Sequence, residues 1–189
     1  MTIDWTRELL EQFTWQWDTH LRPRLEGLTD AEYRWEPVDG CWSIRPRAEA
    51  TTPMAVGAGD HVMDYAFPEP SPAPVTTIAW RIGHLLVGVL GQRNASYFGG
   101  PPTDYPTFDY PAGAQDALNQ LDVMVARWVA GVQSLTPADL EKPCGEDGFE
   151  SSTMAALVLH IHREMLHHGA EIALLRDLFT WRGQPAIRP

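Results

Sequence analysis

The sequence predicts an all-α protein, a four-helix bundle whose helices are joined by long crossover loops. Apolar residues recur at three- and four-residue spacing through several long segments, which is the period of an amphipathic helix. Long proline- and glycine-rich stretches separate these segments, and helices joined by such crossovers are typical of bundles. Hydrophobic residues make up 44% of the 189 residues, which is enough to bury the core of one domain.

The helical period predicts four long helices. The first covers about 4–25 and has Asp4 as its expected N-cap. The second, about 76–97, is apolar nearly all round, so we expect it in the middle of the assembly. The third covers about 113–134, and a short helix is expected to start after it, at Thr136. The fourth and most regular, about 152–181, follows the capping candidates Ser151, Ser152 and Thr153.

Two long loops complete a predicted single domain over 1–189. Residues 29–75 are too many for a plain connection between bundle helices. Within them, 35–45 predicts a short hairpin or an ordered loop, and 69–74 an extended linker. Residues 99–111 interleave prolines with aromatic residues, and long loops of this kind often carry function.

Charge and composition exclude several classes of function. The net charge is −11, from 14 Lys+Arg against 25 Asp+Glu, and no basic stripe is present, so we expect neither nucleic-acid nor membrane-surface binding. The first ten residues do not resemble a signal peptide, and no stretch is long and apolar enough to span a membrane. We therefore expect a cytoplasmic protein. Cys41 and Cys144 are far apart in the chain, and nothing in the sequence indicates a disulfide between them.

The fourth helix carries a histidine-rich cluster with one carboxylate on its apolar face. On a helical wheel, Glu164 and His168 fall one turn apart within the inward stripe, whereas His162 falls on the solvent side and His160 and His167 lie at the edge. The stripe itself consists of Leu157, Ile161, Ile172, Leu175 and Phe179. A carboxylate among apolar side chains must take a proton or bind a cation. A metal ion held by Glu164 and His168 is one reading, and an internal hydrogen bond without metal is the other.

A third ligand is available in the second helix. His84 lies in the middle of that helix, beside Gly83, Gly88 and Gly91, which allow another part of the backbone to come close. Two histidines and one glutamate with an open coordination position form the ligand set of catalytic zinc sites. The sequence therefore predicts one divalent metal ion held by His84, Glu164 and His168.

Other residues are candidates for the surroundings of this site. Glu171, one turn beyond His168, is expected either to orient the His168 ring or to pair with an arginine at the surface. A structural site would be closed by a fourth ligand such as His61, His160 or Glu171. His160 is also a candidate to contact one of the three metal-binding side chains without binding the metal ion itself. Candidate pocket residues are Arg81, Trp42, Tyr105 and Phe108.

Several stretches together resemble the DinB-like superfamily of bacterial metal-binding four-helix bundles. They are Leu28-Thr29-Asp30, Trp35-Glu36-Pro37, residues 77–85 (TIAWRIGHL) and residues 160–178 (HIHREMLHHGAEIALLRDL), the last being the most specific. The resemblance covers most of the chain. It implies a metal held by one histidine of the second helix and an HxxxH pair of the fourth.

Here Glu164 replaces the first histidine of that pair, which is similar to the mycothiol-dependent maleylpyruvate isomerase branch. The resemblance further implies zinc or nickel, an up-down-down-up helix order and frequently a homodimer. It also implies, for some relatives, a low-molecular-weight thiol as cofactor.

The leading interpretation is a metal-dependent transferase, isomerase or hydrolase that acts on a small-molecule substrate. The alternative is a non-catalytic, metal-stabilised stress-response or binding protein, and a metal-free bundle is a third. The residues do not indicate the substrate.

Overall fold

The computed structural model describes residues 3–184 and is mostly helical, as the sequence predicts. The predicted domain bounds 1–189 include residues 1–2 and 185–189, which lie outside the described residues. In chain order the elements are α1 (Trp5–Gln16), the π-helical η1 (Trp17–Leu21), α2 (Arg22–Arg24), α3 (Asp30–Tyr33), β1 (Ile44–Pro46), the 3-10 helix η2 (Arg47–Glu49), β2 (His61–Met63), α4 (Ile78–His84), the π-helical η3 (Leu85–Gly91), α5 (Gln92–Tyr97), α6 (Ala114–Gln133), α7 (Pro137–Glu141) and α8 (Met154–Trp181).

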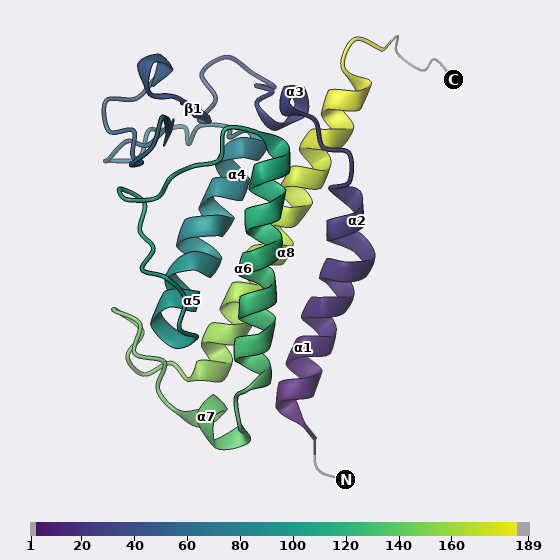
Figure 1. Cartoon of the computed structure of the whole chain (residues 1–189), viewed down its shortest axis with the longest axis vertical. Coiled ribbons are helices and arrows are strands. Elements are labelled where there is room, and N and C mark those ends of the chain that lie inside the picture. The colour runs from purple at the N-terminus through teal and green to yellow at the C-terminus, as the bar shows by residue number, and fades with distance from the viewer. Residues whose placement is uncertain (1–2, 185–189) are drawn as a thin grey trace.

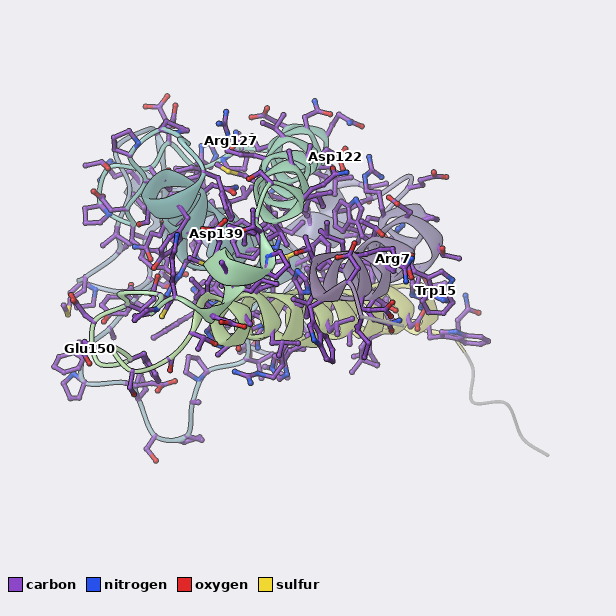
Figure 2. The ribbon with its side chains drawn as sticks, turned by 90° about the horizontal axis from the view of Figure 1, so that it is seen from below. Arg7, Trp15, Asp122, Arg127, Asp139 and Glu150 are labelled. Carbon is purple, nitrogen blue, oxygen red and sulfur yellow. The ribbon has the colours of Figure 1, made fainter. Side chains whose placement is uncertain are left out.

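Long helical runs lie side by side and make up most of the molecule (Figure 1). The elements α1, η1 and α2 form one continuous run, and α4, η3 and α5 form another. α1 packs against α6 and α8, and η3 also packs against both. The short helix α7, marked by Asp139 in Figure 2, lies against α1 and α8 at one end of the long helices. The predicted helix bounds agree with these runs to within about two residues, the usual uncertainty of helix ends.

Side-chain caps explain where the helices begin. The carboxylate of Asp4 accepts from the backbone N–H of Arg7, and the hydroxyl of Thr153 accepts from that of Ala156. Both caps were among the predicted candidates. The hydroxyl of Thr77 accepts from the N–H of Trp80 and so sets the start of α4.

The run from α4 through η3 occupies the centre of the core. Its large apolar side chains are fully buried, namely Ile82, Leu85, Leu86 and Leu90. This confirms the central position that the nearly uniform apolar sequence predicts. Within residues 3–184, none of the helices combines the length and the apolar character that a membrane span requires.

The loop 29–75 is more structured than predicted. It contains α3 and a two-stranded antiparallel sheet in which Ile44 of β1 pairs with Met63 of β2. β1 lies at the end of the stretch 35–45 that predicted a hairpin or an ordered loop, and its partner strand lies well beyond that stretch. The small sheet is therefore an addition to the predicted all-α fold.

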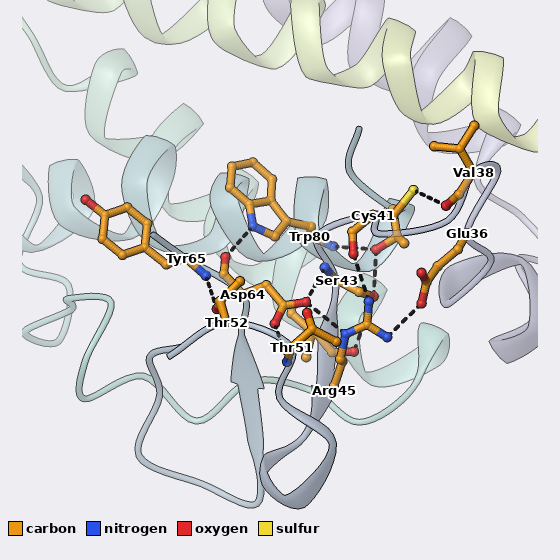
Figure 3. Close-up of polar contacts among 12 residues, drawn as sticks. Glu36, Val38, Cys41, Ser43, Arg45, Thr51, Thr52, Asp64, Tyr65 and Trp80 are labelled. Carbon is orange, nitrogen blue, oxygen red and sulfur yellow. Dashed lines mark hydrogen bonds and ion pairs between the residues drawn. The ribbon is translucent and has the colours of Figure 1, made fainter. Parts of the chain in front are cut away.

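A buried ion pair holds this sheet in place against α4 (Figure 3). The carboxylate of Asp64, which is fully buried, accepts from Nε of Arg45 at 2.8 Å, while Nη1 of Arg45 donates to Glu36 at 2.7 Å. The indole N–H of Trp80 donates to the backbone oxygen of Asp64 at 2.9 Å. Trp80 lies one helical turn before His84, so this network also positions one side of the candidate site.

His162 corrects the helical-wheel prediction. It was placed on the solvent side of the fourth helix, but only 6% of it is exposed, and its ring stacks on Phe13 of α1 at 4.4 Å. The edge of the ring also meets Trp128 of α6, at 6.1 Å. The wheel assumed one buried stripe, whereas α8 is covered on more than one side because α1, α4 and η3 all pack against it.

We expect His162 to make the fold sensitive to acid. Burial lowers its pKa from 6.5 to about 4, so as the pH falls below 6.5 the unfolded chain binds a proton that the folded chain excludes. This weakens folding by about 3 kcal/mol between pH 7 and pH 4. In His162→Phe that component should disappear from the pH dependence of the unfolding free energy, measured with urea.

The matched control is Leu166→Phe, at an exposed position of the same helix, which removes no ionisable group and should leave the pH dependence unchanged. An acid sensitivity of His162→Phe equal to that of the unmodified chain would contradict the assignment.

Candidate metal centre

The structure brings the three predicted ligands together. His84 comes from the end of α4, and Glu164 and His168 come from successive turns of α8, which packs against α4. One ligand atom from each of the three lies within 4.8 Å of the other two. A nitrogen–oxygen cluster of this kind could hold one metal ion.

The orientation of the His168 ring follows from its contact with Glu171. Nδ1 of His168 lies 2.7 Å from Oε2 of Glu171. Nη1 of Arg81, which can only donate, lies 3.3 Å from the same Nδ1, but the contact with the carboxylate is shorter and favours the tautomer in which Nδ1–H donates to Glu171. The lone pair of Nε2 then points the other way, where Oε2 of Glu164 lies 3.4 Å away. The predicted contact between Glu171 and His168 is therefore present.

Two acceptors that face each other at 3.4 Å are stabilised by a positive charge between them, carried by a proton or by a metal ion. A second proton on His168 would supply it, but only 8% of that side chain is exposed and burial lowers its pKa, which disfavours the charged ring. A metal ion supplies the charge without protonating the ring. The residues present therefore fit a divalent cation at this position.

Arg81 holds the other side of this arrangement. Its Nη2 lies 3.1 Å from Oε1 of Glu171, so the pair is neutral and Glu171 stays available as the acceptor for His168. Arg81 was predicted as a pocket residue that presents a cation to a ligand. Instead, its charge is paired with Glu171, and it lies outside the residues that line the cavity beside His84.

His84 is held from its other ring nitrogen as well. Nδ1 lies 2.7 Å from the hydroxyl oxygen of Tyr105, and the ring stacks on Trp80 at 5.5 Å. Burial lowers the pKa of His84 to about 4, so the ring is neutral at neutral pH and can offer a lone pair. Burial raises the pKa of Tyr105 to about 12, so its hydroxyl keeps its proton. The hydroxyl oxygen can also accept, and when the ring hydrogen of His84 sits on Nδ1 and donates to it, Nε2 carries the lone pair that the cluster needs.

Gly88 makes the contact between Tyr105 and His84 possible. A Cβ at this position would collide with the hydroxyl of Tyr105 and crowd the ring of His84. Gly88 lies one turn beyond His84, within η3, and lets the loop 99–111 lie directly on the helix. This is the close approach that the glycines of the second helix predict.

The remaining predicted ligands lie at the margin or elsewhere. Nδ1 of His160 is 3.7 Å from Oε1 of Glu164, and its ring is partly exposed beside Arg163. The side chain of Glu164 keeps 26% exposure, so it is less buried than its position in the apolar stripe implies. His61 belongs to β2 and lies in neither of the clusters that could hold a metal ion among the described residues.

A second cluster, of His167, His168 and Glu171, is less suited to a metal ion. Its ligand atoms are also within 4.8 Å of one another. However, Arg81 already balances the charge of Glu171, and Nδ1 of His168 carries the hydrogen bonded to it. His167 is exposed. The Nε2 side of His168 is therefore the better candidate.

Two cavities adjoin the cluster. The larger, of about 600 Å³, has His84 in its wall together with the predicted Trp42 and Tyr105. Phe108 was predicted to join them, but it packs on Tyr110, at 5.1 Å, and is not part of this wall. The smaller, of about 310 Å³, is lined by Glu164, His84, Gly88, Tyr105 and His160, with Gln92 and Arg93.

Three further residues of the larger cavity, Tyr65, Phe67 and Trp80, are absent from the sequence-based candidates. Trp80 could have been found, because it precedes His84 by four residues and so shares its helix face. Tyr65 and Phe67 lie in a loop, where no period indicates which way a side chain points.

Comparison with known protein families covers the part of the chain that carries this site. A family model described as the DinB superfamily matches residues 12–172, which contain all three candidate ligands as well as Glu171 and Tyr105. No curated protein and no solved structure matches the chain.

We expect Tyr105 to hold one tautomer of His84. In Tyr105→Phe the partner of Nδ1 is lost, and in Gly88→Ala the new methyl group displaces the hydroxyl, so in both variants the ring should exchange between tautomers. Nitrogen-15 NMR of the ring nitrogens in metal-free protein measures this directly. Tyr97→Phe removes a hydroxyl bonded to Cys144 and Glu146 instead, and should leave His84 unchanged. Unchanged His84 signals in Tyr105→Phe would contradict this role.

Proposed function

The chain belongs to the DinB superfamily, and on this premise we propose that it is a metal-dependent enzyme acting on a small-molecule substrate. One divalent ion would be held by His84, Glu164 and His168. The observation that carries the proposal is the position of His168 between two carboxylates, with Nε2 3.4 Å from Oε2 of Glu164 and Nδ1 2.7 Å from Oε2 of Glu171. We further propose the up-down-down-up bundle order, supported by the chain directions in Figure 1, where α1 and α8 rise and α4 and α6 descend.

The donor set favours zinc or nickel. Imidazole nitrogens suit both ions, and two histidines with one carboxylate leave a coordination position open. An ion there would act as a Lewis acid and lower the pKa of a water molecule or a thiol, so that either could lose its proton near neutral pH. Exposure of 26% at the Glu164 side chain is consistent with access from solvent to the cluster.

The chain's own residues orient the ligands and shape the access. Glu171 and Tyr105 each hold the Nδ1 side of one imidazole, so that both Nε2 atoms face the cluster. Arg81 pairs with Glu171 at 3.1 Å and holds that carboxylate in position beside His168. Trp80 covers one face of His84 and shields that side of the ring from water.

Two reactants can approach from different sides, because His84 lines both cavities. The smaller cavity presents Gln92, Arg93 and His160, which suit a polar molecule. We propose that a low-molecular-weight thiol would enter there, and that the reaction is a transfer, an isomerisation or a hydrolysis. The larger, aromatic cavity would then receive the other reactant.

A closed, non-catalytic metal site is the second candidate, and one observation favours it. Nδ1 of His160 is only 3.7 Å from Oε1 of Glu164, so a modest rotation would bring it within reach of the same ion as a fourth ligand. Glu171 is committed to His168 and Arg81, and His61 lies outside the cluster. His160 therefore decides between an open site and a closed one.

Elemental analysis of untagged protein, purified without added metal, tests the site itself. We expect about one zinc or nickel ion per chain, from the three-ligand set. Glu164→Ala and His168→Ala should both lose it while remaining folded by circular dichroism, and His61→Ala should keep it. Folded, metal-free protein that takes up no added zinc or nickel would reduce Glu164 and His168 to a hydrogen-bonded pair.

Zinc affinity, measured by competition with a chelator, tests the supporting contacts. Glu171→Gln should weaken binding about 10- to 100-fold, because the acceptor that fixes the His168 ring is weakened. His160→Ala should leave the affinity within about threefold if the site is open. A loss in His160→Ala as large as that in His168→Ala would support the closed, non-catalytic site instead.

A further inference from the structure

The larger cavity has an aromatic wall, and part of it is held in a fixed position. The rings of Trp42 and Trp80 lie 6.2 Å apart, and those of Trp42 and Tyr65 lie 6.3 Å apart. Trp80 is fixed by its hydrogen bond to the backbone of Asp64, and the backbone N–H of Tyr65 donates to the hydroxyl of Thr52 at 2.9 Å (Figure 3). The part of the wall formed by Trp42 and Trp80 is therefore in place before any ligand arrives, which reduces the entropy lost on binding.

Part of this wall is exposed apolar surface that the fold leaves uncovered. Tyr65 is 40% exposed and Phe67 is 73% exposed, although both line the cavity. Apolar side chains gathered around a cavity mark a binding site more often than scattered ones do. A ligand in the cavity would cover them and gain the free energy of removing their surface from water.

The charges around the cavity select against anions. Its lining contains no lysine or arginine among the described residues. Of its two carboxylates, that of Asp64 is buried and accepts from Arg45 and from the backbone N–H of Ser43, at 3.0 Å. Glu69 is exposed and has no ion-pair partner within residues 3–184. An anionic group would meet a carboxylate and the negative faces of aromatic rings, both of which repel it.

From these observations we propose that the larger cavity binds the apolar body of a small molecule that is uncharged or positively charged in this part. An apolar body matches the Trp42, Tyr65 and Phe67 surfaces, and a positive charge would gain from the ring faces and from Glu69. The inference adds a class of substrate to the proposed function. It rests on the proposed function only where it places the reacting end of the substrate beside His84. The smaller cavity differs, because it presents Arg93 and His160.

Binding of three probes that share a phenyl ring tests the charge selection. They are 2-phenylethanol, 2-phenylethylamine and phenylacetate, titrated calorimetrically into the full chain. Metal is removed with a chelator, because a carboxylate can otherwise bind the ion itself. We expect the alcohol and the amine to bind about 10-fold more tightly than phenylacetate, and Glu69→Gln to narrow the gap between amine and phenylacetate.

The wall itself is tested with Tyr65→Ala and Phe67→Ala, whose exposed side chains contribute little to the core. Each should weaken binding of 2-phenylethanol by about fivefold or more, through lost apolar contact. Trp15→Ala, at an exposed tryptophan of α1 outside the cavity (Figure 2), is the matched control and should not change it. Phenylacetate binding as tightly as the alcohol, or unchanged affinity in both wall variants, would overturn the inference.

The test separates this inference from the metal site. Selective binding in metal-stripped chain and in His168→Ala supports the cavity assignment even if elemental analysis finds no metal. Conversely, one metal ion per chain without selective binding of the probes would leave the metal site standing and remove the substrate class.

Discussion

Both histidines of the candidate centre are held through Nδ1, and the geometry around the cluster depends on that constraint. Glu171 holds His168 and Tyr105 holds His84, which leaves Nε2 of each ring outside these contacts, and Nε2 of His168 lies 3.4 Å from Glu164. Each anchor needs support of its own. Glu171 is balanced by Arg81, and Tyr105 reaches His84 only because Gly88 has no side chain. Metal ligands without such partners rotate freely and bind less tightly.

The long loops are part of the site and not only connections between helices. Residues 99–111 bring Tyr105 onto η3. Residues 29–75 form the small sheet and contain the Asp64–Arg45 ion pair, in which Asp64 lines the aromatic cavity. The carboxylate of Asp64 is paired with Arg45, so it adds no unpaired negative charge to the cavity wall. The backbone oxygen of Asp64 accepts from the indole N–H of Trp80 and holds that ring in place. The ion pair within the loop and the position of Trp80 in the cavity wall therefore both depend on Asp64, the first through its carboxylate and the second through its backbone oxygen. The exposed Phe67 and Glu69 then define the chemistry at its margin.

The helix periods predict much of the fold and fail at identifiable places. Element bounds and caps follow from local sequence, because a helix is stabilised by contacts three and four residues apart. The inward placement of His168 follows from the same spacing. The buried position of His162 does not, because a wheel with one buried stripe cannot represent a helix packed on several sides.

The sequence by itself determined the mostly helical class, the family and the three candidate ligands, since Glu164 and His168 lie one turn apart and His84 stands in the most apolar helix. Only the tertiary structure decided which groups surround them. Tyr105 against His84, β1 against β2, Arg81 against Glu171 and Phe13 against His162 are all contacts between distant parts of the chain. Such contacts leave no period in the sequence, because they depend on how the helices and loops pack and not on their spacing along one helix.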